Sequence, residues 1–146
     1  MQQARHRTRW RRNFLSALEL LARASTRLPF GVPDPVLCGE SAVELYTGGL
    51  WSAADLEVIG TDTRSLTSEL FAVGFRWSDR PRQPERGLWH PDLRIGIDIT
   101  EARAAPSIAE PPNTLVVVLD LDPSLSRDEA SLKVIAIEDL IVQQVG

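Results

Sequence analysis

A chain of 146 residues with 43% hydrophobic and 25% charged residues has the size and composition of one globular domain, which excludes a fully disordered chain, a collagen and a bare coiled coil. The net charge of −4 hides an asymmetry, because five of the 16 basic residues lie among the first twelve residues, where there is no acid. The single cysteine, Cys38, excludes an internal disulfide and suggests the cytoplasm, and no apolar run approaches the roughly 18 residues of a membrane span or forms a secretory signal.

The first predicted element is an amphipathic helix over residues 8–27, because Trp10, Phe14, Leu18 and Leu21 follow helical spacing. We therefore divide the chain into a basic N-terminal helix, residues 1–28, and a core domain, residues 29–146. The N-terminal arginines could bind the phosphates of a nucleic acid or pair with acids of the chain's own body, and we favour the second. They are Arg5, Arg7, Arg9, Arg11 and Arg12.

Two strand-and-helix pairs follow. A short apolar strand at 36–38 precedes a helix at 41–46, which Gly48 and Gly49 stop. A strand at 56–59 precedes a second helix, whose N-cap lies among residues 61–63 and whose C-terminal glycine is Gly74.

The second half of the chain is rich in predicted strands. We expect strands at 75–77, 88–90, 93–99, 115–119 and 132–137, a turn at residues 91–92, loops at 79–87 and 102–113, and a final helix at 138–145. This order of elements predicts an α/β or α+β fold, in which helices pack against a sheet.

Three acidic residues on these strands are the candidates for chemistry. Asp55 and Glu57 are two residues apart, so a strand places them on one face, roughly 6.6 Å apart along the backbone. Asp98 points away from the isoleucine face of the strand at 93–99. If the two strands are neighbours, the three carboxylates converge, and such hard oxygen ligands suit Mg²⁺ together with substrate phosphates.

A glycine turn precedes the acid pair. The chain passes from the strand at 36–38 through Gly39 into a helix, and the free N–H groups at a helix start favour a phosphate. Together, the turn and the acids predict binding of a nucleoside triphosphate with its metals.

The segment from Leu37 to Ile59 resembles the signature of the DNA polymerase beta-type nucleotidyltransferase superfamily, in which a glycine turn and a spacer precede an acid-apolar-acid-apolar strand. The strand around Asp98 is similar to the one that carries the third acid of that family. Residues 134–141 are similar to the strand-to-helix segment that closes the core in its toxin-like branch, which includes the abortive-infection type IV toxins. The resemblance covers about residues 30–145.

The resemblance implies a nucleotidyltransferase-like mixed sheet and a role for each matched residue. Gly39 and Ser41 would cradle the triphosphate, and Asp55, Glu57 and Asp98 would bind Mg²⁺ or Mn²⁺. Asp98 would also activate the attacking hydroxyl. The implied reaction moves a nucleoside monophosphate to a hydroxyl of an RNA 3′ end, a protein or a small molecule, and releases pyrophosphate. A cognate antitoxin or another partner subunit is a further implied partner.

The sequence departs from the family pattern at several points. Glu40 stands where the family has a second glycine, no basic residue precedes Asp55, and Glu57 replaces the more frequent Asp. The chain ends at Gly146, where toxin-like relatives continue into a helical region. These departures leave open a catalytically inactive module of the same fold that serves in binding or toxin–antitoxin interaction, besides nucleic-acid binding through the arginine arm.

The tryptophans allow two interpretations. Trp51, Trp77 and Trp89 could stack on a nucleobase or pack in the core or at its rim, and the sequence alone favours packing.

Overall fold

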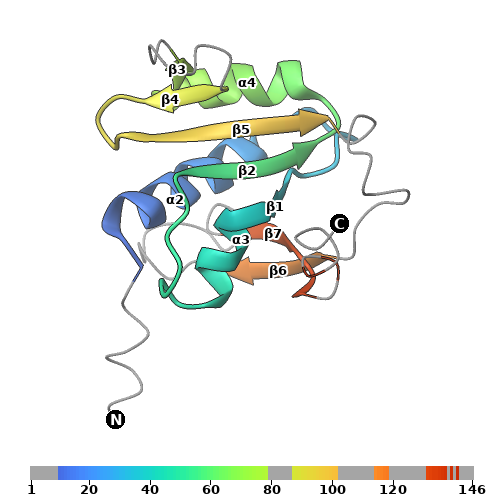
Figure 1. Cartoon of the computed structure of the whole chain (residues 1–146). Coiled ribbons are helices and arrows are strands. Elements are labelled where there is room, and N and C mark those ends of the chain that lie inside the picture. The colour runs from blue at the N-terminus through green and yellow to red at the C-terminus, as the bar shows by residue number, and fades with distance from the viewer. Residues whose placement is uncertain are drawn as a thin grey trace.

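The computed structural model describes residues 10–78, 87–101, 114–118 and 131–137, together with residues 139 and 141. Within this part of the chain, seven strands form one mixed sheet, and three complete helices pack against it, α2 (Arg12–Thr26), α3 (Gly39–Tyr46) and α4 (Thr63–Ala72) (Figure 1). The mixed α/β architecture predicted from the sequence is confirmed. No helix in the described residues combines the length and the apolar character that a bilayer crossing requires.

The centre of the sheet is made by the first two strands of the chain. The strands are β1 (Val36–Cys38), β2 (Asp55–Gly60), β3 (Arg76–Trp77), β4 (Leu88–His90), β5 (Ile95–Glu101), β6 (Thr114–Val118) and β7 (Ser131–Ile135), and their spatial order is β3-β4-β5-β2-β1-β7-β6. β2 runs parallel to β5 and antiparallel to β1, while β1 runs parallel to β7. The parallel pair β2–β5 requires a crossover, and α4 with the β3–β4 hairpin supplies it.

Helix α2 covers one face of the sheet and belongs to its core. It begins at Arg12 rather than at residue 8. Its residues Phe14, Leu18 and Leu21 are at most 1% exposed and share one apolar cluster with Leu56 and residues of four other strands. The helix lies behind the sheet in Figure 1 and contacts α4, β5 and β7. The division at residue 28 remains a prediction, but the helix and the sheet fill a single core.

Local capping sets the limits of α3 and α4. At the end of α3, the N–H groups of Gly48 and Gly49 donate to carbonyls of the last turn. This is the Schellman arrangement, in which glycine adopts positive φ. At the start of α4, Asp62 accepts a hydrogen bond from the N–H of Ser65, and Gly74 forms the second Schellman end, with the N–H of Phe75 donating to the carbonyl of Leu70. The predicted N-cap region and both predicted glycine stops are therefore confirmed.

Three strand predictions and one helix prediction need correction. The strand predicted at 132–137 ends at Ile135, and Ile137 is already helical. The strand predicted at 93–99 begins only at Ile95, because residues 91–94 form a turn in which Arg94 has a φ of 57° and its N–H donates to the carbonyl of His90. The strand predicted at 75–77 shrinks to β3, since Phe75 belongs to the helix end. The helix predicted at 41–46 begins two residues earlier, at Gly39.

Other sequence predictions lie partly or wholly outside the described residues. These are the arginines before Trp10 and the loops at 79–87 and 102–113. The final helix predicted at 138–145 is described only at residues 139 and 141, which are helical, as is Ile137 just before it.

Candidate functional site

The three candidate acids lie on one face of two adjacent strands. Asp55 and Glu57 alternate with Leu56 and Val58 on β2, and both apolar residues are fully buried on the opposite face of the sheet. Asp98 of β5 is the register partner of Glu57, so these two side chains are direct cross-strand neighbours. The parallel pairing of β2 and β5 therefore brings together the three residues that the sequence singled out. We call this side of the sheet the acid face.

Each carboxylate has its own backbone environment. Asp55 is 5% exposed, and its Oδ1 accepts a hydrogen bond of 3.0 Å from the N–H of Gly96 on β5. The carboxylate of Glu57 packs against Gly39, where an added Cβ would overlap it. A Cβ on Gly87 would lie 2.9 Å from Oδ1 of Asp98 and would overlap the carbonyl oxygen of Ile97. Glycine is thus required at both places by close approach, and each has positive φ.

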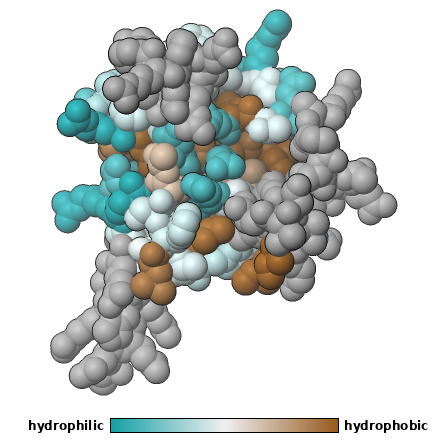
Figure 2. Space-filling model, viewed as in Figure 1, coloured by the Kyte–Doolittle hydropathy of each residue, from teal (hydrophilic) through white to brown (hydrophobic). Residues whose placement is uncertain are grey.

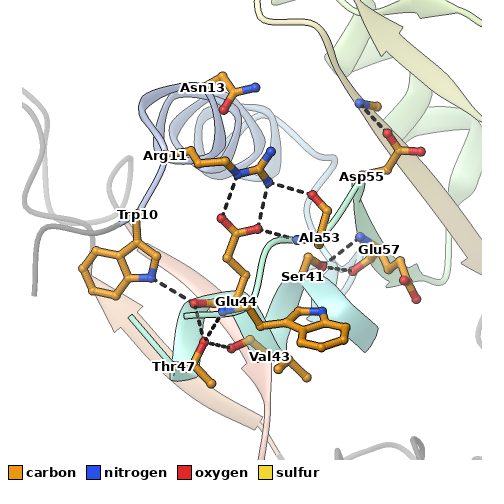
Figure 3. Close-up of polar contacts among 12 residues, drawn as sticks. Trp10, Arg11, Asn13, Ser41, Val43, Glu44, Thr47, Ala53, Asp55 and Glu57 are labelled. Carbon is orange, nitrogen blue, oxygen red and sulfur yellow. Dashed lines mark hydrogen bonds and ion pairs between the residues drawn. The ribbon is translucent and has the colours of Figure 1, made fainter. Parts of the chain in front are cut away.

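The glycine turn is held to β2 by a buried hydroxyl. Ser41 is fully buried, and its Oγ accepts a hydrogen bond of 2.9 Å from the N–H of Glu57 (Figure 3). The same Oγ donates a hydrogen bond of 2.8 Å to the carbonyl of Cys38. These bonds fix the start of α3 beside the acid-bearing strand. The Ser41 side chain therefore has a structural task, and its predicted part in holding a triphosphate remains a prediction.

The N-terminal end of α3 already faces a negative group. The Glu57 carboxylate packs against Gly39, the first residue of the helix, where the helix dipole and free N–H groups favour an anion. Glu40, the departure from the family pattern, has an exposed side chain. A phosphate bound at this helix end would have to share the place with Glu57 or displace it.

A buried ion pair beside the site escaped the sequence analysis. Glu44 of α3 is fully buried, and its carboxylate accepts two hydrogen bonds from Arg11, of 2.8 and 3.1 Å, and one of 2.7 Å from the N–H of Ala53. Arg11 also donates to the carbonyl of Ala53, and the indole N–H of Trp10 donates to the carbonyl of Glu44 (Figure 3). We call Trp10, Arg11, Glu44 and Ala53 the clamp. It joins α2, α3 and the start of β2, two residues before Asp55.

The sequence carried a faint signal for the clamp. Glu44 lies three residues after Ser41, on the inward face of a short helix, where an acid needs a buried cation or donors. For Arg11 the structure supports the favoured interpretation of the arginines, because it pairs with an acid of the body.

The three acids have the ligand atoms that a hard divalent cation prefers, but their side chains are not arranged around one ion. Carboxylate oxygens are the ligands that Mg²⁺ and Mn²⁺ prefer. Among the described residues, however, no three His, Cys, Asp or Glu side chains are gathered closely enough to hold one ion. Asp55 is engaged with Gly96, and Glu57 is turned toward Gly39. A cation bound by all three acids would require these two side chains to rotate.

A cavity of about 530 Å³ lies elsewhere on the molecule. Phe30, Asp34 and Lys133 contribute to its walls, between the end of α2 and the start of β7. Lys133 is the register partner of Val36, at the opposite end of β1 from Cys38, which pairs with Glu57. None of the three candidate acids lines this cavity.

The surface seen in Figure 2 is mixed in character. From the same side as in Figure 1, hydrophilic residues spread over the left and the centre of the view, and apolar residues appear in separate patches between them. No single large apolar patch is visible among the coloured residues of this side.

Comparisons with protein-family models, with curated proteins and with solved structures find no match to this chain.

Proposed function

We propose that this chain is a divalent-cation-dependent nucleotidyltransferase that transfers a nucleoside monophosphate from a nucleoside triphosphate to a hydroxyl. The observation that carries the proposal is the placement of Asp55, Glu57 and Asp98 on one face of two paired strands, beside the N-terminal end of α3. The order glycine turn, helix, acid pair, helix, third acid agrees with the family resemblance of the sequence and supports the same function.

Electrostatics favours a cationic ligand at this face. Two carboxylates about 4 Å apart repel by about 4 kcal/mol at an effective dielectric constant near 20. Glu57 and Asp98 are cross-strand neighbours, and Asp55 is two residues from Glu57 on the same side. A divalent cation offsets this repulsion and, when bound, stabilises the negative charge that develops on a transferring phosphoryl group.

The residues of the chain then have distinct tasks. Asp55, Glu57 and Asp98 would hold the cation, and the first amides of α3 would bind a phosphate. Asp98 would accept the proton of the attacking hydroxyl. As the oxygen of that hydroxyl bonds to the α-phosphorus, the bond from this phosphorus to its bridging oxygen breaks and pyrophosphate leaves. The acceptor would be an RNA 3′ end, a protein or a small molecule, and an antitoxin or partner subunit would regulate the enzyme.

A second candidate function is an inactive module with the same architecture, acting in binding or in toxin–antitoxin interaction. Two observations favour it: the Ser41 hydroxyl is used by the protein backbone, and the Glu57 carboxylate lies where a phosphate would bind. The two candidates differ in whether a triphosphate binds with a divalent cation.

Calorimetry with ATP, GTP, CTP and UTP, each with and without Mg²⁺ or Mn²⁺, tests the first proposal. We expect one or more of the triphosphates to bind only with the cation, and Asp55→Asn and Asp98→Asn to abolish binding. Asp92→Asn, on the exposed turn after β4, is the matched control and should bind as the wild type does. Radiolabel transfer from α-labelled triphosphates to RNA and protein acceptors then separates catalysis from binding. No cation-dependent binding of any triphosphate would refute the proposal.

A further inference from the structure

The tryptophans of the sheet region lie in different environments. Trp77 of β3 is the register partner of Leu88, whose own partner is Ile97, so Trp77 lies on the helix-covered side of the sheet. There it meets Phe71 of α4 edge to face, with ring centroids 5.7 Å apart, and stays 66% exposed. Trp51 lies in the loop after α3, and Trp10 belongs to the clamp. Neither Trp77 nor Trp10 is available to a ligand on the acid face.

Trp89 is the tryptophan that the sheet register places on the acid face. On β4 it pairs with Gly96 of β5, and Gly96 pairs in turn with Asp55 of β2. One row across three strands is thus formed by Trp89, Gly96 and Asp55. The central residue is a glycine, so no side chain lies between Trp89 and Asp55. The outer two backbones of this row are about 10 Å apart, which is twice the strand spacing.

A second glycine lies beside Asp98, close to Trp89 along the chain. Gly87 lies two residues before Trp89 and packs against the backbone and the carboxylate of Asp98. Asp98 is itself two residues beyond Gly96 on β5 and is therefore the diagonal neighbour of Trp89, a position within reach of an aromatic side chain. The half-buried Trp89 is consequently the one large side chain beside the acids on β4.

From this row we propose that Trp89 is the platform on which the base of the nucleotide stacks. The three acids would bind the phosphates of the same nucleotide through the cation. This inference rests on the proposed function and adds the residue that binds the base, because an indole stacks on the π-face of a base and has no such contact with an inorganic polyphosphate. Stacking on an aromatic side chain tolerates every base. The site therefore selects nucleotides over inorganic phosphates and discriminates weakly among the four bases.

The experiment compares two ligands in the full chain. Affinities for ATP and for inorganic tripolyphosphate, both with Mn²⁺, are measured for the wild type, Trp89→Ala, Trp89→Phe and Trp77→Ala. We expect Trp89→Ala to weaken ATP binding by roughly 5- to 150-fold, the range for loss of one stacked base, and to leave tripolyphosphate binding unchanged. Trp89→Phe should recover part of the ATP affinity, and Trp77→Ala should bind both ligands as the wild type does.

The other outcomes are equally informative. An equal loss for ATP and tripolyphosphate in Trp89→Ala would mean that Trp89 only shapes the site, and would overturn the platform. Unchanged ATP binding in Trp89→Ala, with binding abolished in Asp98→Asn, would overturn the platform and leave the proposed function intact. If the wild type binds neither ligand, the platform is refuted, and the proposed function fails with it only if GTP, CTP and UTP do not bind either. Trp89→Phe retains an aromatic ring, so it keeps the test valid if Trp89→Ala does not fold.

Discussion

Arg11 and Glu44 form an ion pair, and its contribution to stability depends on how deeply the two side chains are buried. Glu44 is fully buried and Arg11 has a 35% exposed side chain, so the pair exchanges water for three hydrogen bonds to the carboxylate, including the one from Ala53. Removing one member leaves the other without its charge partner, which is the most destabilising change at a buried pair. The stability of the clamp and the position of the acid-bearing strand are therefore linked.

Arg11→Ala should lower the free energy of unfolding by about 3 kcal/mol, the lower end of the range for breaking a buried pair, because Arg11 keeps some contact with water. Chemical denaturation followed by circular dichroism measures the change. Arg12→Ala is the matched control, because Arg12 is the next residue in the chain and its side chain is exposed. This substitution should change the free energy of unfolding by less than about 0.5 kcal/mol. Equal effects of the two substitutions would mean that the clamp does not stabilise the fold.

At the level of single residues, the sequence predicted on which face of a strand a side chain lies better than which residue of another element it contacts. Strand periodicity was sufficient to place Asp55 and Glu57 on one face, because side chains alternate along any strand. It could not show that Glu57 pairs with Asp98, because neighbouring strands are chosen by contacts far apart in the chain. The burial of the Ser41 hydroxyl and the pairing of Arg11 with Glu44 depend on such contacts too.

Among the elements, those with local end signals were predicted most closely. Helix α4 is bounded by the Asp62 cap and by Gly74, and both signals lie within a few residues of the helix. β3 was predicted longer than it is, because its ladder depends on pairing with β4 rather than on its own residues. The turn predicted at residues 91–92 extends to Arg94, and nothing in the local pattern announces the positive φ of that residue.

The cap of α4 also predicts a pH dependence. Hydrogen bonds from the N–H and then the hydroxyl of Ser65 hold the pKa of Asp62 below its ordinary value. A carboxyl with a lowered folded pKa stabilises the protein above its unfolded pKa, about 3.9, and this stabilisation is lost as the pH falls through the folded pKa.

Asp62→Asn keeps a side-chain acceptor at the cap but cannot titrate. We therefore expect the wild type to lose more of its urea midpoint between pH 7 and pH 3 than Asp62→Asn does, so that the two proteins converge in acid. Asp62→Ala removes the acceptor and should be less stable than Asp62→Asn throughout. Parallel loss in wild type and Asp62→Asn would show that the charge on Asp62 contributes nothing.

At the scale of the whole molecule, α2 and the sheet share one apolar core. Phe14, Leu18 and Leu21 fill the same core as the strands. We expect residues 29–146 alone to lack a cooperative urea transition, because removal of these side chains leaves the helix-covered face of the sheet open to water. A chain that begins at Trp10 retains α2 and the clamp, and should unfold cooperatively. A cooperative transition in residues 29–146 would instead support an independent core domain.

The distances spanned by α2 have a consequence for synthesis on the ribosome. Arg11 meets Glu44 33 residues later and Ala53 42 residues later, and the Asn13 amide donates to Leu93, 80 residues away. The helix also packs on β7, near the other end of the chain. Helix α2 therefore leaves the exit tunnel well before the strands that bury it, and its apolar stripe stays uncovered until those strands have been made. A chaperone that shields this stripe during translation would raise the yield of native protein.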